Sequence, residues 1–296
     1  MPWCRANRSR FCGGEMRKAW AGNGFLLAGI LFFLACPVFG RGRAAAADYI
    51  TGSGCSVSNV GYLSELAKEY EMRTGTKVFV RGGGSVIGIE DLRRGKVDFA
   101  AACRGREGGD PQDIQFVQVA WDVLVFIVNP SNPVDTISLD QVRGIYSRRF
   151  ANWSQLKGAD MSIRTFIARP RKGLSGVEAS ISRMVLGGKE PAASANIVAV
   201  SSSGIAEQMV EDTPAGFATS GYASARKRKV KMLKVDGVAP SFKNIVSGRY
   251  LLRRPLYILT SKHPAPDVKK FLDFVTGRQG QQFIQSQGVV PVMDVK

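Results

Sequence analysis

The sequence predicts an α/β fold in which parallel strands are covered by helices. Two observations predict it. Short apolar segments alternate with segments whose apolar residues recur at helical spacing, and turns rich in glycine and serine follow several of the apolar segments. This strand-turn-helix rhythm is typical of parallel sheets, whose neighbouring strands are connected by helices.

The first βα series begins at Asp48. Its expected strands are short and apolar and cover 49–52, 77–80 and 97–102. Its expected helices have apolar residues at helical spacing and cover 60–74, with Gly75 as the stop, and 87–94. The β-rich run 115–129 follows. Because it is too long for one ordinary strand, it is interpreted as crossing from one lobe of the protein to another.

A second βα series follows the long run. Its expected strands cover 163–168, 197–200, 216–219 and 255–260. Its expected helices cover 137–146, 175–186, 203–210, 267–276 and 279–287. The sequence has no internal repeat of solenoid period, which excludes the repeat architectures.

The N-terminal region has the layout of a secretory signal peptide. Arg17 and Lys18 precede an uncharged, mostly apolar run at 25–39, and the alanines at 44–47 supply an A-x-A site with cleavage before Asp48. The apolar run is short for a membrane-spanning helix. The predicted signal peptide is therefore residues 1–47, and an uncleaved anchor is the alternative.

Two details of this region qualify the prediction. Residues 1–15 make an unusually long leader before Met16. This suggests that Met16 is the natural start and that the first 15 residues come from a start site assigned too far upstream. Cys36, in the sequence F-L-A-C, loosely resembles a lipoprotein cleavage box, so lipid anchoring is a second, less favoured outcome.

The chain is basic, with 41 Lys and Arg residues against 24 Asp and Glu residues. Residues 1–47 hold seven basic residues and one acidic residue, so the remainder keeps a net charge of +11. A basic surface suits an anionic ligand, although nucleic acid or membrane would also suit it. The densest run, 226–231, has no interleaved aromatic residues for base stacking, so nucleic-acid binding is not expected.

The sequence argues against several kinds of site. His263 is the single histidine and there is no C-x-x-C, so neither a zinc site, a cofactor nor a histidine-based triad is expected. Val57 stands where a dinucleotide fingerprint needs its third glycine, and no G-K-[ST] follows the glycine-rich loops. No nucleophile-base set is present either, so we do not expect an enzyme.

Three loops combine glycine, serine and a following helix. They are G-S-G-C-S at 52–56, G-G-G-S at 82–85 and G-L-S-G at 173–176. Glycine allows close backbone approach, serine adds a hydroxyl donor, and the helix start presents unpaired N–H groups. Arg171 can add a bidentate charged contact. Three such loops meeting at one cleft would bind a tetrahedral oxyanion without a metal.

The ordered series of landmarks over residues 48–296 resembles the phosphate-binding subunits of phosphate ABC importers. The landmarks are I-T-G-S-G-C-S at 50–56, R-G-G-G-S at 81–85, V-D-F at 97–99, D-V-L-V-F-I-V-N-P-S-N at 122–132, F-A-N-W at 150–153, R-K-G-L-S-G at 171–176, P-L-Y at 255–257, G-R-Q-G-Q at 277–281 and G-V-V-P at 288–291.

The resemblance implies a two-lobed periplasmic binding protein fold of type II, with two crossing strands as the hinge. Each lobe is then a mostly parallel sheet flanked by helices. Lobe one is expected at 48–121 plus 253–296, and lobe two at 122–252. The implied function is capture of inorganic phosphate by a monomer in the periplasm and delivery to the permease and ATPase subunits of an ABC importer.

The resemblance also implies a set of ligand residues. They comprise hydroxyl donors, backbone donors, one arginine and the residue at the family's aspartate position, and they are Ser56, Val57, Ser85, Cys103, Arg171, Ser175 and Gly176. Cys55 and Cys103 both fall at the expected ligand mouth, where they could form a disulfide or remain buried thiols.

Two departures from the family pattern bear on the ligand. Val177 replaces a threonine, and Cys103 followed by Arg104 replaces the aspartate of the best-known members. In the family, that aspartate accepts the proton of hydrogen phosphate and so helps to reject sulfate. The alternatives therefore remain another oxyanion, such as sulfate or molybdate, and a sensor or interaction protein on the same fold.

Overall fold

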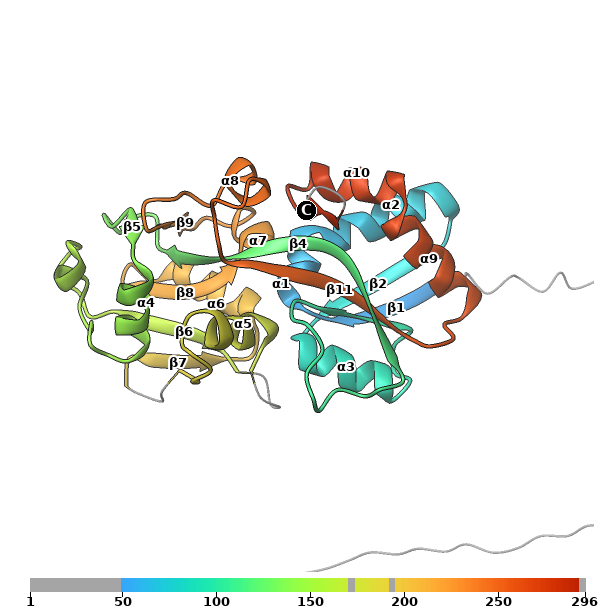
Figure 1. Ribbon diagram of the computed structural model, residues 1–296, viewed down its shortest axis with the longest axis horizontal. Helices are drawn as coiled ribbons and strands as arrows, with labels where there is room; N and C mark the ends of the chain where they lie inside the picture. The colour runs from blue at the N-terminus through green and yellow to red at the C-terminus, as the bar shows by residue number, and fades with distance from the viewer. Residues whose placement is uncertain (1–48, 170–173, 192–194, 293–296) are drawn as a thin grey trace, which may run out of the picture. The chain divides into compact units, whose positions relative to one another are not determined.

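The computed structural model describes residues 49–169, 174–191 and 195–292 (Figure 1). By internal contacts the chain divides into two units, 1–44 and 45–296, and the fold described below lies within the second. The predicted signal peptide, residues 1–47, and Cys36 lie outside the described residues. Among the described residues, no helix has the length and apolar character needed to cross a membrane.

The first part of the sheet comes from the N-terminal βα series. Strands β2 (Lys77–Gly82), β1 (Tyr49–Gly54) and β3 (Phe99–Ala102) run parallel, with β1 in the middle. β11 (Arg253–Ser261) joins the other side of β3 as an antiparallel strand. All four residues of β3 are buried, as expected for a strand with neighbours on both sides and helices over its faces.

Strand β4 (Ile114–Val128) is the long run that the sequence singled out, and it crosses between two sets of strands. It pairs with β11 up to Val123 and with β8 (Gly216–Gly221) from Leu124 onward. Figure 1 shows β4 and β11 running side by side through this crossing. The prediction that this run passes from one sheet region to another is confirmed.

The second part of the sheet continues from β8. Strands β6 (Arg164–Ala168) and β7 (Ile197–Val200) run parallel to each other, and β6 runs parallel to β8. Each part of the sheet is therefore mostly parallel and flanked by helices, as predicted. The exact lobe boundaries, 48–121 plus 253–296 and 122–252, remain a prediction.

The hydrophobic core follows the crossing strand. Every side chain from Val123 to Val128 on β4 is fully buried, and Phe126 stacks on Phe217 of β8 with ring centroids 6.1 Å apart. Burying each large apolar side chain contributes about 1.5–3 kcal/mol, so the core is concentrated where the two sheet parts meet.

The other elements are mainly helices and short strands. They are α1 (Ser56–Ser58), η1 (Asn59–Leu63), α2 (Ser64–Thr74), α3 (Ser85–Arg93), β5 (Thr136–Ile137), α4 (Leu139–Tyr146), η2 (Trp153–Leu156), α5 (Gly176–Met184), α6 (Ser203–Asp212), α7 (Tyr222–Ala225), β9 (Lys231–Met232), β10 (Lys234–Val235), α8 (Phe242–Val246), α9 (Pro266–Thr276), α10 (Arg278–Ser286) and β12 (Val290–Pro291).

Most expected elements are present with boundaries shifted by one or two residues, and two of these shifts concern helices in the second series. The helix expected over 137–146 begins only at Leu139, because Ser138 caps it by accepting a hydrogen bond from the Gln141 backbone N–H at 3.0 Å. The helix expected over 175–186 ends at Met184. The short helices α7 and α8 were not predicted, since neither is long enough to show helical periodicity.

Candidate anion-binding site

The first candidate loop joins β1 to α1. Gly54 has a φ of 140°, and a Cβ there would lie 2.2 Å from a carbonyl oxygen of β3, so this turn requires glycine. Cys55 then caps α1, with its Sγ accepting a hydrogen bond from the Ser58 backbone N–H at 3.4 Å. Ser56 and Val57 therefore begin the helix, where backbone N–H groups lack partners within the helix.

The second candidate loop joins β2 to α3 and is tied to the first. The backbone N–H groups of Gly83 and Gly84 both donate to the carbonyl oxygen of Gly54, at 2.9 and 2.8 Å. Ser85 begins α3, and its Oγ accepts a hydrogen bond from the Cys103 backbone N–H at 3.2 Å. The end of β3 is thereby held against the same loops.

The third candidate loop precedes α5 in the predicted second lobe. Ser175 caps α5 by accepting a hydrogen bond from the Glu178 backbone N–H at 3.2 Å. A Cβ on the next residue, Gly176, would lie 2.6 Å from both Cys103 Sγ and Ser85 Oγ. Only a residue without a side chain lets α5 approach the first lobe this closely.

Further contacts join the two predicted lobes at this point. Ser180 Oγ lies 3.4 Å from the Cys103 carbonyl oxygen, to which it donates. On α6, a Cβ at Gly204 would lie 3.9 Å from the Cβ of Ser56. Ser175 Oγ is 3.4 Å from Ser203 Oγ, which connects α5 to α6.

The structure therefore brings most of the predicted ligand residues to one interlobe contact. Ser85, Cys103 and Gly176 meet directly, and Ser175 and Ser56 border them. All of these side chains are buried: Ser56 is 8% exposed, and those of Val57, Ser85, Cys103 and Ser175 are at most 2% exposed. Arg171 lies outside the described residues.

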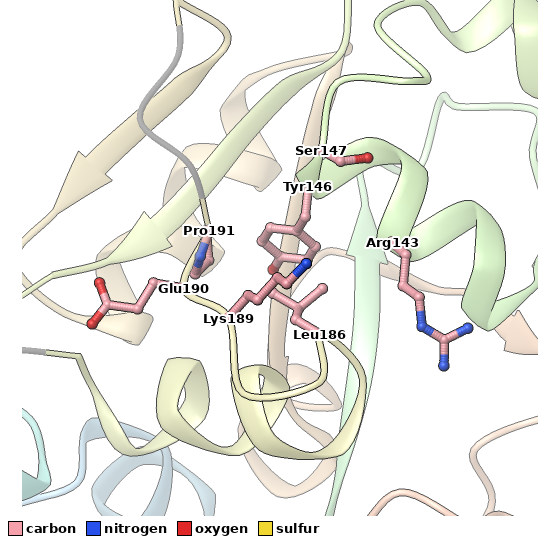
Figure 2. Close-up of a pocket in the computed structure, with 7 residues that line it drawn as sticks. All are labelled: Arg143, Tyr146, Ser147, Leu186, Lys189, Glu190 and Pro191. Carbon is pink, nitrogen blue, oxygen red and sulfur yellow. The ribbon is translucent and has the colours of Figure 1, made fainter.

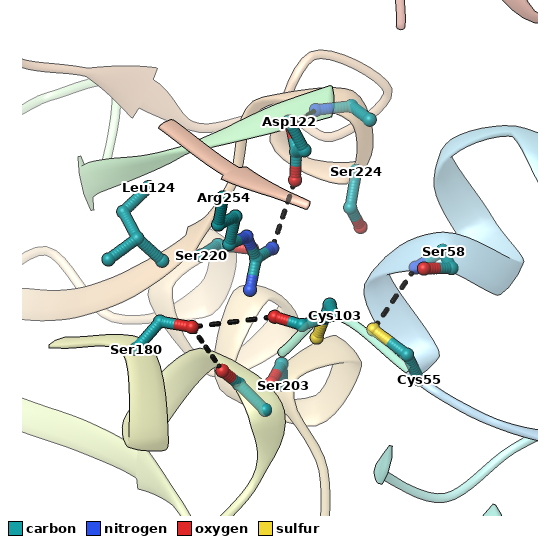
Figure 3. A network of polar contacts seen from close by, with 12 residues as sticks. Cys55, Ser58, Cys103, Asp122, Leu124, Ser180, Ser203, Ser220, Ser224 and Arg254 are labelled. Atoms are coloured by element: carbon teal, nitrogen blue, oxygen red, sulfur yellow. Dashed lines mark hydrogen bonds and ion pairs between the residues drawn. The ribbon is translucent and has the colours of Figure 1, made fainter. Parts of the chain in front are cut away.

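A buried ion pair lies beside this contact, and sequence reasoning missed it. Asp122 of β4 and Arg254 of β11 are each 2% exposed, and Asp122 Oδ2 lies 2.9 Å from Arg254 Nη2 (Figure 3). Asp122 Oδ1 also accepts a hydrogen bond from the Ala223 backbone N–H at 3.1 Å. A Cβ at Gly221 would lie within 2.4 Å of the ion pair and of Val57, so the pair is packed directly behind the first loop.

The guanidinium of Arg254 is only partly satisfied. Its Nε and Nη1 are buried and have no hydrogen-bond partner among the described residues. Unpaired buried donors are costly, and they mark a place where a negatively charged group would be stabilised. The only sequence signal was the pair of arginines at the start of β11, which does not distinguish a buried arginine from an exposed one.

Cys55 and Cys103 form a pair of buried thiols, each at most 2% exposed. Burial raises the pKa of the Cys55 thiol well above its usual value, and the neighbouring Cys103 thiol raises it further. For the Cys103 thiol, the effect of burial is outweighed by the neighbouring Cys55, the positive charge of Arg254 and the Ser85 hydroxyl, which together lower its pKa. Both are free thiols here, and a disulfide between them remains the other alternative that the sequence left open.

Two cavities, of about 590 and 240 Å³, flank the interlobe contact. The larger is lined by Val86 and Arg104 from the first predicted lobe and by Leu174 and Ala179 from the second. Arg104 forms a bidentate pair with Asp110, at 2.7 and 2.8 Å, so its charge is already neutralised. None of the predicted ligand residues that the structure describes lines either cavity.

A separate cavity of about 310 Å³ lies between α4 and the segment after α5 (Figure 2). Arg143, Tyr146 and Leu186 line it, and none of the predicted ligand residues does. It is therefore distinct from the candidate site. Among the residues that the structure describes, no cluster of three or more His, Cys, Asp or Glu side chains is arranged to hold a metal ion.

A family model described as the PBP superfamily domain matches residues 40–279. The chain belongs to the PBP superfamily. This superfamily comprises binding proteins, and the resemblance drawn from the sequence landmarks is confirmed.

Relatives of this PBP superfamily chain carry phosphate-binding names. It is 29% identical over 260 residues to the phosphate-binding protein PstS of Bacillus subtilis, covering 86% of this chain and 85% of the relative. It is 26% identical over 274 residues to the phosphate-binding protein PstS of Borreliella burgdorferi, covering 89% and 97%.

Solved structures of phosphate-transport binding proteins share the fold. An ABC-type phosphate transport receptor from Vibrio cholerae is 26% identical and superposes with a TM-score of 0.62, covering 82% of this chain and all of the receptor. A phosphate-bound substrate-binding protein from Clostridium perfringens, 23% identical, has a TM-score of 0.74 and covers 83% of this chain and all of that protein. The predicted two-lobed α/β fold is confirmed.

Proposed function

We propose that this protein captures inorganic phosphate between its two lobes and delivers it to the permease and ATPase subunits of an ABC importer. The observation that carries the proposal is the close approach of Gly176 on α5 to Ser85 and Cys103 of the first lobe. Relatives named phosphate-binding proteins over most of the chain length support phosphate as the ligand.

The chemistry of the proposed site is that of helix starts meeting an anion. The N-terminal N–H groups of α1, α3 and α5 would donate to phosphate oxygens, and the helix dipoles would favour its negative charge. The hydroxyls of Ser56, Ser85 and Ser175 would add donors, and Arg171 would supply a bidentate charged contact. Because these groups come from both lobes, a bound anion would favour the closed arrangement.

The proposed location is outside the cytoplasm, as for other members of the family. Residues 1–47 would direct export and be removed before Asp48. The released protein would act as a monomer in the periplasm, with lobe one formed by 48–121 plus 253–296 and lobe two by 122–252.

Calorimetry on the purified protein with phosphate, sulfate and molybdate tests this function. We expect phosphate to bind with one site per chain, and Arg171→Ala to abolish binding because it removes a charged contact to the anion. Arg164→Ala is the matched control, since Arg164 is exposed and begins β6, whereas the candidate loops follow the ends of the strands. Binding of sulfate or molybdate without phosphate would identify another oxyanion as the ligand. No binding of any of the three would favour the sensor alternative.

A further inference from the structure

The smaller of the two cavities beside the interlobe contact is lined mainly by arginines. Its volume is about 240 Å³, and its walls come from the loop after β3, helix α5 and the start of strand β11. Half of the described residues that line it are arginines, and none of them is acidic; the arginines are Arg104, Arg183, Arg253 and Arg254. The larger neighbouring cavity is different, because Glu107, Asp110 and Glu190 line it. The smaller one, called the arginine cavity below, is therefore cationic.

Two of these arginines have no carboxylate partner. Asp110 accepts hydrogen bonds from Arg104 at 2.7 and 2.8 Å, and Glu107 lies 3.6 Å from the same guanidinium, so the charge of Arg104 is neutralised. Arg183 is exposed in the last turn of α5, and Arg253 is half-buried at the start of β11. Neither of these two side chains has a hydrogen-bond or ion-pair partner in the part of the chain that the structure describes. Two positive charges at the cavity are thus left without compensation.

The fourth arginine adds buried donors. Arg254 is 2% exposed, and Asp122 pairs with its Nη2 only, while Nε and Nη1 have no hydrogen-bond partner among the described residues. Figure 3 shows the guanidinium pointing toward Ser180, which lines the same cavity. Ser180 is itself held in place, since its Oγ donates to the Cys103 carbonyl oxygen at 3.4 Å. Buried donors without a partner are costly, and an anion beside them would remove that cost.

We propose that the arginine cavity is a second anion site, which binds a small oxyanion with at least two negative charges, such as diphosphate. The inference goes beyond the proposed function and does not depend on it, because none of the predicted ligand residues that the structure describes lines this cavity. A guanidinium presents a planar fork of donors that matches two oxygens of a phosphoryl or carboxylate group. Arg183 and Arg253 would each hold one charged end of the anion.

The size of the cavity agrees with an anion that has two charged ends. A water molecule takes up about 30 Å³ of liquid, so a cavity of about 240 Å³ has room for about eight waters. Diphosphate has a similar number of non-hydrogen atoms, whereas a single phosphate would fill only part of this space. The two unpaired arginines also belong to different elements, α5 and β11, so an anion with two ends can contact both.

Calorimetry with sodium diphosphate tests this inference. The protein is kept in about 0.15 M salt, which screens weak attraction to exposed charges, and in a slight molar excess of phosphate, which fills the interlobe site if the proposed function holds. We expect one diphosphate to bind per chain. Arg183→Gln and Arg253→Gln should each weaken this binding roughly 10-fold, the usual effect of removing one hydrogen bond to a charged group.

Arg249→Gln is the matched control. Arg249 is exposed, precedes β11 and lines another cavity, so its substitution removes the same charge from the chain without touching the proposed site. Diphosphate affinity should be unchanged in this variant. An equal loss in all three variants would show general attraction to a basic protein, and it would overturn the inference. So would the absence of diphosphate binding, or binding that the slight excess of phosphate abolishes, since the latter would place diphosphate in the interlobe site.

A second measurement needs only the wild-type protein, in case a variant does not fold. Phenylglyoxal modifies accessible arginine side chains, and mass spectrometry identifies the modified residues. Diphosphate should slow the modification of Arg183 and Arg253 and leave that of Arg249 unchanged. Equal modification of Arg183 and Arg253 with and without diphosphate would contradict the inference. Failure of the protein to bind phosphate would refute the proposed function, and the protection expected at these two arginines would still decide whether the second site exists.

Discussion

Adding one methyl group at Gly176 should make closure of the two lobes less favourable. A Cβ there would lie 2.6 Å from Cys103 Sγ and from Ser85 Oγ, whereas ordinary contacts between such atoms are about 3.5–4.0 Å. Both neighbours are held by hydrogen bonds and are buried, so α5 would have to move back by roughly 1 Å. Overpacking of this kind costs about 1–3 kcal/mol, and here the cost falls on the closed form.

Gly176→Ala should therefore weaken phosphate binding by about 5- to 150-fold in calorimetry. The free energy of unfolding without ligand should change little, since the lobes can separate, while the rise in melting temperature on adding phosphate should shrink. Gly108→Ala is the control, because Gly108 has no neighbouring atom within 4 Å and no positive φ. Unchanged phosphate affinity in Gly176→Ala would refute the view that α5 closes onto the first lobe as described.

Three further predictions concern buried groups. Burial raises the pKa of Glu178 to about 7, above its usual 4.5, so the wild type should lose stability as the pH rises between these values. Glu178→Gln should then be the more stable protein at about pH 8, by up to about 3 kcal/mol in urea unfolding, and Glu71→Gln should show no such gain. Arg254→Met should lower the free energy of unfolding by about 3–5 kcal/mol, because it leaves Asp122 buried without its ion-pair partner. Adding Asp122→Leu should restore most of this free energy. Equal stability of the single and double variants would contradict this. Thiol titration of the protein without residues 1–47, denatured without reductant, should find two free thiols, as in the structure; no free thiol would show that Cys55 and Cys103 form the disulfide that the sequence left open.

Local sequence signals were sufficient to predict the loops of the candidate site. Glycine stands in these turns because the local backbone conformation and packing require it. Gly54 shows this with its positive φ and its close approach to β3. The crossing strand β4 was also predictable, because an apolar run of this length extends beyond the strands that a single sheet region can pair with it. Each of these signals lies within about 15 residues of sequence.

The charges of the site could not be predicted in this way. Asp122 and Arg254 are 132 residues apart, and neither has a neighbourhood that distinguishes it from a surface charge. Their pairing depends on the antiparallel register of β4 with β11, which sets Arg254 opposite Asp122. Register is a tertiary property, fixed by packing of the two sheet parts, so a single sequence without that packing does not specify it.

The position of this ion pair connects the hinge to the candidate site. Asp122 and Arg254 face each other at the end of the β4–β11 pairing, next to Leu124, where β4 begins to pair with β8. The same guanidinium acts on the Cys103 thiol, and Asp122 holds the backbone of α7 through Ala223. Any change of charge at the interlobe contact therefore acts on a residue that also joins the two crossing strands.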